Sequence, residues 1–359
     1  RNHMLKEMTL KAVINGREIE SSSGKTILEG ARDSGVDIPT LCFDSRVKPS
    51  ASCRLCSVNV KGRRLPVAAC AQKLEPEMEI TTNSPDLESM RKTILDLVVS
   101  ENPTGECVRC EEIGTCELHA LTKRYGAKPG HFHGALSGET SKDTNPFIFR
   151  DYSQCILCYR CTAVCGELEQ AHAIVPAGRG FGSRIAAAFD SGLLESSCTF
   201  CGQCIQTCPT GALMDRKMLG QAKASEVTKV KTVCPYCGTG CGLNLHVANN
   251  KVIGTTPDWD SPSGEGSLCV KGQFATDFIG SKDRLATPLI RRNGVLTEAT
   301  WDEAYDLIVE KFTQIKKESG PNAFTFWTSA RATTESNYIM QKFARAVIGT
   351  NNVDNCSRT

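Results

Sequence analysis

The sequence lacks the long apolar segments and the excess of one charge that would direct the chain to a membrane or to a nucleic acid. No run approaches the roughly 18 consecutive apolar residues that span a bilayer, and the mean hydropathy is −0.24. Lys and Arg number 42 against 40 Asp and Glu, which gives no electrostatic case for nucleic acid or anionic membrane as a partner. The first residues show neither an apolar signal segment nor a twin-arginine leader, so we expect a cytoplasmic protein.

Cysteine, by contrast, is in large excess, with 20 among 359 residues. A chain of this length has room for two to four domains, at roughly 100–200 residues each. Because cytosolic thiols stay reduced, metal ligation explains this excess better than disulfides do. Nearly all the cysteines fall into groups along the chain, and Cys356 stands alone. We interpret Cys356 as a small packed residue.

Two of the groups repeat the spacing C-x2-C-x2-C-x3-C, which is typical of bacterial ferredoxins with two clusters. One loop supplies three corners of a cubane, and the fourth Cys of each run ligates the other cluster. The sequence therefore predicts two [4Fe–4S] clusters with the following ligands: Cys155, Cys158, Cys161 and Cys208 for one, and Cys198, Cys201, Cys204 and Cys165 for its neighbour. The alternative is structural zinc, which usually uses separated C-x2-C pairs.

The N-terminal segment predicts a small β domain. Residues 8–14 and 17–20 form two strands around an Asn15-Gly16 turn, and residues 26–34 form a short helix. Four cysteines follow with the spacing C-x10-C-x2-C-x13-C: Cys42, Cys53, Cys56 and Cys70. Pro39-Thr-Leu-Cys42 and Ser52-Cys-Arg-Leu-Cys56 resemble the plant-type [2Fe–2S] domain of large redox subunits. A zinc site on a small β domain is the alternative.

A helix is predicted after this domain, with Ser84 as N-cap and Pro85 at its first position. Its apolar side chains recur at helical spacing and should belong to the core: Leu87, Met90, Ile94, Leu97 and Val98.

The next group, Cys107, Cys110 and Cys116, lacks an evident fourth ligand. It resembles the cluster site that complex I-like subunits and iron hydrogenases place after their [2Fe–2S] domain. In that family a His precedes the first Cys pair, and residues 101–106 contain none. His119 is the nearest substitute. His131 and His133 are more distant and are more simply explained as surface or packed imidazoles. An altered fourth ligand or a labile three-cysteine site stays open.

The last third carries a different spacing, C-x2-C-x3-C-x27-C, with these cysteines: Cys234, Cys237, Cys241 and Cys269. Glycines crowd the loop, as close approach of the backbone to a cluster requires. The pattern resembles the [4Fe–4S] domain of the molybdenum and tungsten bis-pterin oxidoreductases. The resemblance implies that Lys271 lies between cluster and pterin and helps to relay electrons. The simpler interpretation is a solvated lysine.

The remaining residues predict an α/β domain. Thr300 and Glu303 form a capping box before a helix whose buried stripe should be Ala304, Leu307, Ile308, Phe312 and Ile315. A strand over 323–328 and a helix over 336–347 that ends near Gly349 begin a doubly wound fold. Residues 329–334 then lie at the carboxyl end of the strand, where a cofactor would bind.

Three segments of this domain closely resemble metal-dependent formate dehydrogenases, especially those with selenocysteine: residues 301–304, 337–349 and 350–354. In that family Asn-Asn-Val-Asp shortly precedes the selenocysteine or cysteine that binds the metal, followed by His. That residue would lie just beyond Thr359. Our hypothesis is that a selenocysteine codon was read as a stop, and the alternative is a designed end of the chain. We therefore expect the chain alone to be inactive with formate.

The resemblance implies that the full-length enzyme interconverts formate and carbon dioxide at Mo or W held by two pterin guanine dinucleotides. Electrons would pass through Lys271, the Cys234 cluster and the paired clusters to the Cys107 and [2Fe–2S] sites. This makes one [2Fe–2S] and up to four [4Fe–4S] clusters, with flavin-, NAD(P)- or ferredoxin-linked subunits as partners. A stand-alone electron-transfer module is one alternative, and a fragment of an iron hydrogenase or complex I-type subunit is another.

The expected fold class is α+β with several domains. A β-grasp [2Fe–2S] domain (5–83) precedes a small helical cluster domain (84–140) and a two-[4Fe–4S] ferredoxin domain (141–224). The [4Fe–4S] domain of a Mo/W oxidoreductase (228–285) and the start of a pterin-binding α/β domain (286–359) complete the chain.

Overall fold

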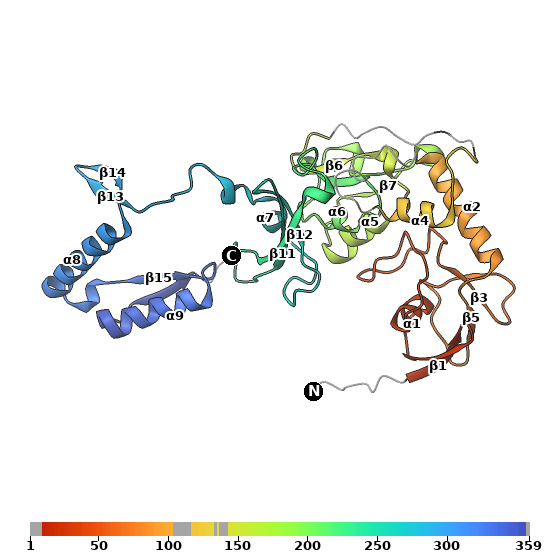
Figure 1. Cartoon of the computed structure of the whole chain (residues 1–359), viewed down its shortest axis with the longest axis horizontal. Coiled ribbons are helices and arrows are strands. Elements are labelled where there is room, and N and C mark those ends of the chain that lie inside the picture. The colour runs from red at the N-terminus through yellow and green to blue at the C-terminus, as the bar shows by residue number, and fades with distance from the viewer. Residues whose placement is uncertain (1–8, 103–115, 133–134, 136–142, 357–359) are drawn as a thin grey trace. The chain divides into compact units, whose positions relative to one another are not determined.

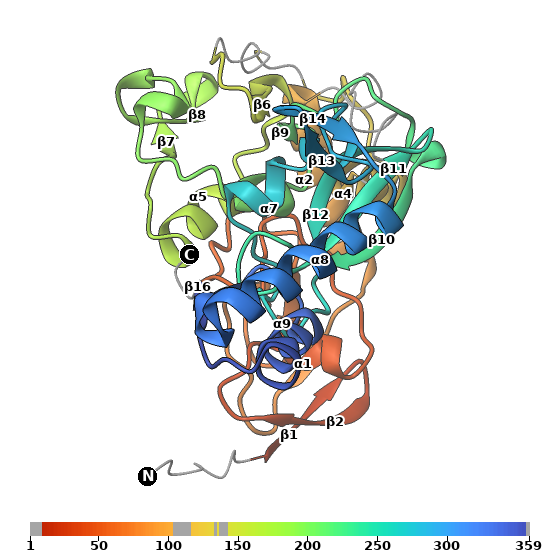
Figure 2. The same ribbon diagram turned by 90° about the vertical axis from the view of Figure 1, so that its left-hand side faces the viewer.

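The computed structural model describes residues 9–102, 116–132, 135 and 143–356. The chain divides into two compact units, residues 1–228 and residues 229–359, close to the predicted boundary after the ferredoxin segment. Figures 1 and 2 show their elements from two sides. In the part of the chain that the structure describes, no helix is both long and apolar enough to cross a bilayer.

The first unit begins with a five-stranded mixed sheet in the order β2-β1-β5-β3-β4. The strands are β1 (Thr9–Ile14), β2 (Arg17–Ser22), β3 (Ser57–Val60), β4 (Val67–Ala68) and β5 (Glu79–Thr81). Asn15 and Gly16, with φ of 52° and 79°, turn the β1–β2 hairpin as expected. Helix α1 (Ile27–Asp33) starts at a capping box of Thr26 and Glu29 and buries its apolar face in the core of this sheet.

Helices α2 (Pro85–Glu101) and α4 (Glu117–Tyr125) pack together after this sheet. Ser84 caps α2, and Pro85 occupies its first position, as predicted. The predicted apolar stripe is wrong at Leu97, which is 49% exposed. The buried residues are Leu87, which the stripe includes, with Leu95, Val99 and two charged residues, Arg91 and Asp96. The buried residues Leu87, Arg91, Leu95 and Val99 recur every four positions, so the core side of the helix lies away from Leu97.

The cysteine runs lie in a small two-layered segment. Strands β6 (Ile148–Arg150) and β9 (Leu213–Asp215) pair antiparallel across it, and β7 (Val175–Ala177) and β8 (Arg184–Ala186) form a second antiparallel pair. Helix α5 (Arg160–Ala163) continues as a wider helical turn through Leu168, and α6 (Gln203–Thr207) packs against it. Each helix lies within one cysteine run, so the two runs have similar local structures.

The second unit contains two regions. In the first, β10 (Thr228–Val233), β11 (Gly242–Ala248) and β12 (Lys251–Pro257) form a sheet, and α7 (Val270–Phe274) contacts β12. A hairpin of β13 (Leu289–Arg292) and β14 (Val295–Glu298) follows. Then come α8 (Trp301–Ser319), β15 (Phe326–Ser329), α9 (Thr334–Lys342) and β16 (Val353–Cys356).

Strands β15 and β16 pair in parallel across the α9 connection, which is the start of the doubly wound fold that the sequence predicts. Three predictions here are wrong in detail. The strand begins at Phe326 because residues 321–323 form a tight turn. No residue of α8 is buried: Ile308 and Ile315 are 46% and 38% exposed, and Phe312 packs partly buried against the core of this region. Cys356 is exposed rather than packed.

Candidate metal centres

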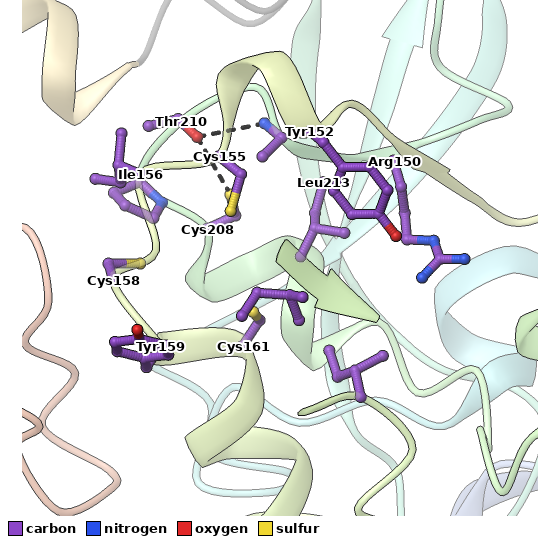
Figure 3. Close-up of a pocket in the computed structure, with 14 residues that line it drawn as sticks. Arg150, Tyr152, Cys155, Ile156, Cys158, Tyr159, Cys161, Cys208, Thr210 and Leu213 are labelled. Atoms are coloured by element: carbon purple, nitrogen blue, oxygen red, sulfur yellow. Dashed lines mark hydrogen bonds between the residues drawn. The ribbon is translucent and has the colours of Figure 1, made fainter. Parts of the chain in front are cut away.

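The first cavity gathers the thiols of Cys155, Cys158 and Cys161 with that of Cys208, from the other run (Figure 3). It encloses about 510 Å³, part of it open to solvent. Leu157 and Tyr159 adopt left-handed backbone conformations, with φ of 50° and 64°. These turns wrap the loop around the cavity before α5 begins, and Cys208 arrives from the end of α6.

The second cavity repeats this arrangement with the roles of the runs exchanged. Its thiols come from Cys198, Cys201 and Cys204 and from Cys165 of the first run, around about 460 Å³. Phe200 and Gly202, with φ of 53° and 76°, occupy the places of Leu157 and Tyr159. The structure thus brings together the two groups of four that the spacing predicts. Ligation itself stays a prediction.

The electrostatics of both cavities suit a positively charged inorganic core. Burial raises the pKa of Cys155 to about 11 and of Cys158 to about 12, and burial likewise raises the pKa of Cys201 to about 11. Thiolates are the ligating form, so these thiols would need a cation in the cavity to stay deprotonated. Within the described ranges, no three Cys, His, Asp or Glu side chains are grouped as ligands of one metal ion.

The thiols predicted to bind a [2Fe–2S] cluster also lie together, at one edge of the N-terminal sheet. The backbone N–H of Cys53 lies 3.5 Å from Cys42 Sγ, and the Cys56 and Cys70 side chains are fully buried. Thiol donors from Cys53 and Cys70 lower the pKa of Cys42, and the Cys70 thiol lowers that of Cys56 to about 7. These contacts link all four thiols into a coherent ligand set.

A buried arginine fixes the loop that carries two of these thiols. Arg91 on α2 is 2% exposed. Its Nε donates to Leu55 O at 3.1 Å, and its Nη2 donates to Ser57 O at 3.1 Å and to Thr82 O at 2.8 Å. Leu55 lies between Cys53 and Cys56, so the arginine holds the ligand loop directly. Sequence reasoning missed Arg91, although a charge at a core position of α2 was a usable signal.

The [2Fe–2S] loop contacts the ferredoxin segment. Ser50 Oγ lies 3.4 Å from Cys158 O and also hydrogen-bonds to the Cys42 thiol. Thr207 Oγ1 donates to Asp44 Oδ2 at 2.7 Å, from the end of α6. The loop that carries the [2Fe–2S] thiols is therefore hydrogen-bonded to the ferredoxin segment, at Cys158 of the first cavity and at Thr207.

The third predicted site is described only in part, because Cys107 and Cys110 lie outside the described residues, as does His133. Cys116 caps α4, and its Sγ lies 3.7 Å from Pro209 O, beside Cys208. His119 is exposed, and only its backbone N–H approaches Cys116 Sγ, at 3.4 Å. His131 Nδ1 lies 3.3 Å from the buried carboxylate of Asp96, which gives this imidazole a partner on α2.

In the second unit, Cys234, Cys237, Cys241 and Cys269 lie near one another. Burial and the neighbouring thiols raise the pKa values of Cys234 and Cys241. Gly264 permits a close approach, because its φ is 86° and a Cβ there would lie 3.3 Å from Cys241 Sγ. Lys271 is exposed on α7, and its charge acts to lower the pKa values of Cys234 and Cys237.

The carboxyl end of β15 touches this cysteine loop. Arg331 Nε donates to Tyr236 O at 2.7 Å, and a Cβ on Gly238 would lie 3.4 Å from Ala330 Cβ. Residues 329–334 therefore border the loop between Cys234 and Cys241. Sequence reasoning placed this segment at a cofactor edge but missed the role of Arg331.

Four family models match the chain. They are a 2Fe-2S iron-sulfur cluster binding domain (residues 7–85) and the ferredoxin-like domain of NADH-quinone oxidoreductase subunit 3 (residues 145–214). The molybdopterin oxidoreductase Fe4S4 domain (residues 227–281) and the molybdopterin oxidoreductase model (residues 284–359) match the rest.

Similar proteins include an NADH-quinone oxidoreductase subunit of Rhizobium meliloti, 34% identical over 97% of this chain and 40% of that protein. A "Putative formate dehydrogenase" of Staphylococcus aureus is 31% identical over 97% of this chain and 39% of that protein. The chain thus spans about two fifths of these relatives.

Among solved structures, one of an NAD+-reducing [NiFe]-hydrogenase is similar, with a TM-score of 0.52 and 27% identity. The similarity covers 59% of this chain and 90% of that chain. With two thiol-lined cavities, a third thiol group in the β domain and a fourth beside the α/β segment, these matches lead to one conclusion. Residues 227–281 and 284–359 are similar to molybdopterin oxidoreductases, and residues 7–85 and 145–214 are similar to the iron–sulfur domains of redox subunits.

Proposed function

We propose that the chain is the electron-relay portion of a formate dehydrogenase or carbon dioxide reductase. It would carry electrons between a Mo or W bis-pterin site and partner subunits, through one [2Fe–2S] and up to four [4Fe–4S] clusters. The observation that carries this proposal is the pair of cavities in which each cysteine run supplies three thiols to one and a fourth to the other. That exchange is the ligation pattern of two adjacent cubanes.

Contacts within the first unit support a route between the sites that it contains. The Cys116 thiol touches Pro209, which lines the first cavity, and Ser50 joins the Cys42 thiol to the Cys158 carbonyl. In the second unit, Cys269 and the exposed Lys271 belong to the segment that would face the pterin. The bis-pterin metal, when bound, would supply the site at which formate and carbon dioxide interconvert. We propose that this chain, about two fifths of its relatives, does not turn over formate by itself.

A second candidate is the equivalent portion of an NADH-quinone oxidoreductase subunit. The 34% identity to the Rhizobium meliloti protein favours it, and so does the match of residues 145–214. Both candidates require the same relay. They differ in whether the full-length protein holds Mo or W and reduces its clusters with formate.

The first experiment is elemental analysis for Fe, Mo, W and Zn on the chain purified without oxygen. Five clusters correspond to about 18 iron per chain, and loss of the Cys107 cluster would leave about 14. Either value without Mo or W, and with no formate oxidation, supports the proposal. Stoichiometric zinc in place of iron would contradict the relay, and stoichiometric Mo or W would contradict the inactivity of the chain alone.

The same assays on the full-length protein separate the two candidates. Formate-dependent bleaching of the clusters by a protein that contains Mo or W supports the dehydrogenase. Bleaching by NADH through partner subunits, with neither metal present, supports the second candidate.

A further inference from the structure

Arg150 is a buried cation that lines both ferredoxin cavities. It ends strand β6, where Ile148 and Arg150 are buried and Phe149 between them is not fully buried. Alternation along a strand puts Ile148 and Arg150 on the same face, and Ile148 also lines the second cavity. Arg150 is 6% exposed, so its guanidinium must find its partners inside the protein.

Only one nitrogen of the guanidinium has a hydrogen-bond partner, and its Cζ lies 5.9 Å from the centroid of the Tyr152 ring. Nη2 donates to Asp143 Oδ2 at 2.9 Å, in an ion pair of which both members are 6% exposed. Nε and Nη1 are buried without a hydrogen-bond partner. A buried charged donor left unpaired is costly, so two such donors on one side chain indicate an acceptor that the polypeptide itself does not supply.

The second cavity is where that acceptor would lie. In Figure 3 the guanidinium points away from the four labelled thiols of the first cavity. Asp143, which holds the guanidinium, accepts a hydrogen bond from the backbone N–H of Leu193 at 3.0 Å, and Leu193 lines the second cavity. The charge of Arg150 also acts to lower the pKa of Cys198, a thiol of that cavity.

We propose that Arg150 donates hydrogen bonds from Nε and Nη1 to sulfur atoms of the cluster held by Cys165, Cys198, Cys201 and Cys204, and so raises the reduction potential of that cluster. This inference rests on the proposed relay function. Reduction adds one electron, supplied by the neighbouring cluster or by a redox mediator, and it breaks no bond. The added negative charge strengthens hydrogen bonds to the sulfurs, which favours the reduced state.

The two cysteine runs of the internal repeat differ in the residue that precedes them. Arg150 precedes the first cysteine run, and the equivalent place before the second run is held by Leu193. The other half of the repeat therefore offers no such donor at this position. Two clusters with matching cysteine spacing would then differ in potential, with the second as the better electron acceptor.

The test is a mediated redox titration of the full chain, purified without oxygen and followed by electron paramagnetic resonance. Arg150→Lys keeps a positive charge beside Asp143 but removes the two donors. We expect the reduction equilibrium of the second cluster to fall about tenfold, a shift of about 59 mV to lower potential. The first cluster should shift less, and a Cys165→Ser variant identifies the signal of the second.

Asp143→Asn gives a second measurement with the opposite sign. It removes the carboxylate that offsets the arginine charge and leaves the donors in place, so the potential of the second cluster should rise. If Arg150→Lys loses iron, Asp143→Asn still tests whether Arg150 raises the potential of the second cluster. An unchanged potential in Asp143→Asn would then overturn the proposal.

Arg216→Lys is the matched control. Arg216 Nη2 donates to Asp143 O at 3.1 Å, in the same neighbourhood, but Arg216 lines neither cavity. It should leave both potentials unchanged. Equal shifts in Arg216→Lys and Arg150→Lys, or an unchanged potential in an iron-replete Arg150→Lys, would overturn the role of Arg150 alone. A wild-type chain without iron would instead overturn the relay function on which that role rests.

Discussion

At the scale of single residues, buried arginines have roles that a cysteine count does not reveal. Arg91 satisfies three backbone carbonyls around the [2Fe–2S] loop, and Arg150 leaves two donors for an acceptor near the second cavity. Arg160 bridges Glu117 and the Thr207 carbonyl, so it joins the helix after Cys116 to the end of α6. Each arginine lies beside a predicted ligand and fixes or complements it.

Arg91→Met should destabilise the first unit by about 3 kcal/mol or more, because buried carbonyls lose a charged donor. The [2Fe–2S] cluster should also become labile, since the Leu55 carbonyl between two ligand cysteines is released. Denaturant unfolding and the visible absorption of the cluster measure these two effects. Arg64→Met is the control, because Arg64 is exposed. Equal stability of the two variants would contradict the structural role of Arg91.

At the scale of elements, the second unit contains a buried imidazole in the sheet beside its cysteine loop. His246 on β11 is 4% exposed, and its Nε2 lies 2.9 Å from Thr256 Oγ1. Burial, with the charge of Lys229, lowers the pKa of His246 to about 4. The folded sheet therefore holds this histidine neutral at a pH where the unfolded chain binds a proton.

The second unit should lose stability as the pH falls from about 6.5 to about 4. Over this interval the unfolded state takes up a proton that the folded state does not, so stability rises with pH and is complete above the ordinary histidine pKa. The loss should reach about 3 kcal/mol at the lower limit. Comparing unfolding of the wild type with His246→Gln isolates this contribution from acid damage to clusters. Parallel pH profiles for the two proteins would refute it.

At the scale of the whole molecule, the chain consists of two units with separate thiol groups. The connection between β9 and β10 carries the exposed Lys223 at a short turn, and exposed turns of this kind are preferred sites of proteolysis. Each unit has its own core, so each should retain its metal when the connection is cut.

Limited trypsin treatment should cut after Lys223 and give fragments that keep their iron. We expect about 14 iron on the N-terminal fragment and about 4 on the C-terminal one. Lys223→Ala should slow the cut without changing the total iron. Fragments that release their clusters on cleavage would show instead that the units depend on one another.

Much of this organisation was predictable from the sequence because cysteine spacing and local turn chemistry act over short distances. The Asn15-Gly16 hairpin, the Thr26 and Thr300 capping boxes and the Ser84 N-cap all depend on residues within a few positions of each other. Leu97 and Ile308 were assigned wrongly because periodicity shows that a helix has an apolar side but not how much of that side its neighbours cover.

The sequence by itself determined which thiols form groups, since a run of closely spaced cysteines cannot reach every corner of a cluster and must borrow from its repeat. Only the tertiary structure decided what surrounds those groups. Three arginines contact or face atoms that lie far from them along the chain: Arg91, Arg150 and Arg331. Burial makes an arginine such as Arg91 a specific hydrogen-bond donor. Long-range packing sets the dielectric and the hydrogen bonds around each thiol, and neither can be predicted from local cysteine spacing.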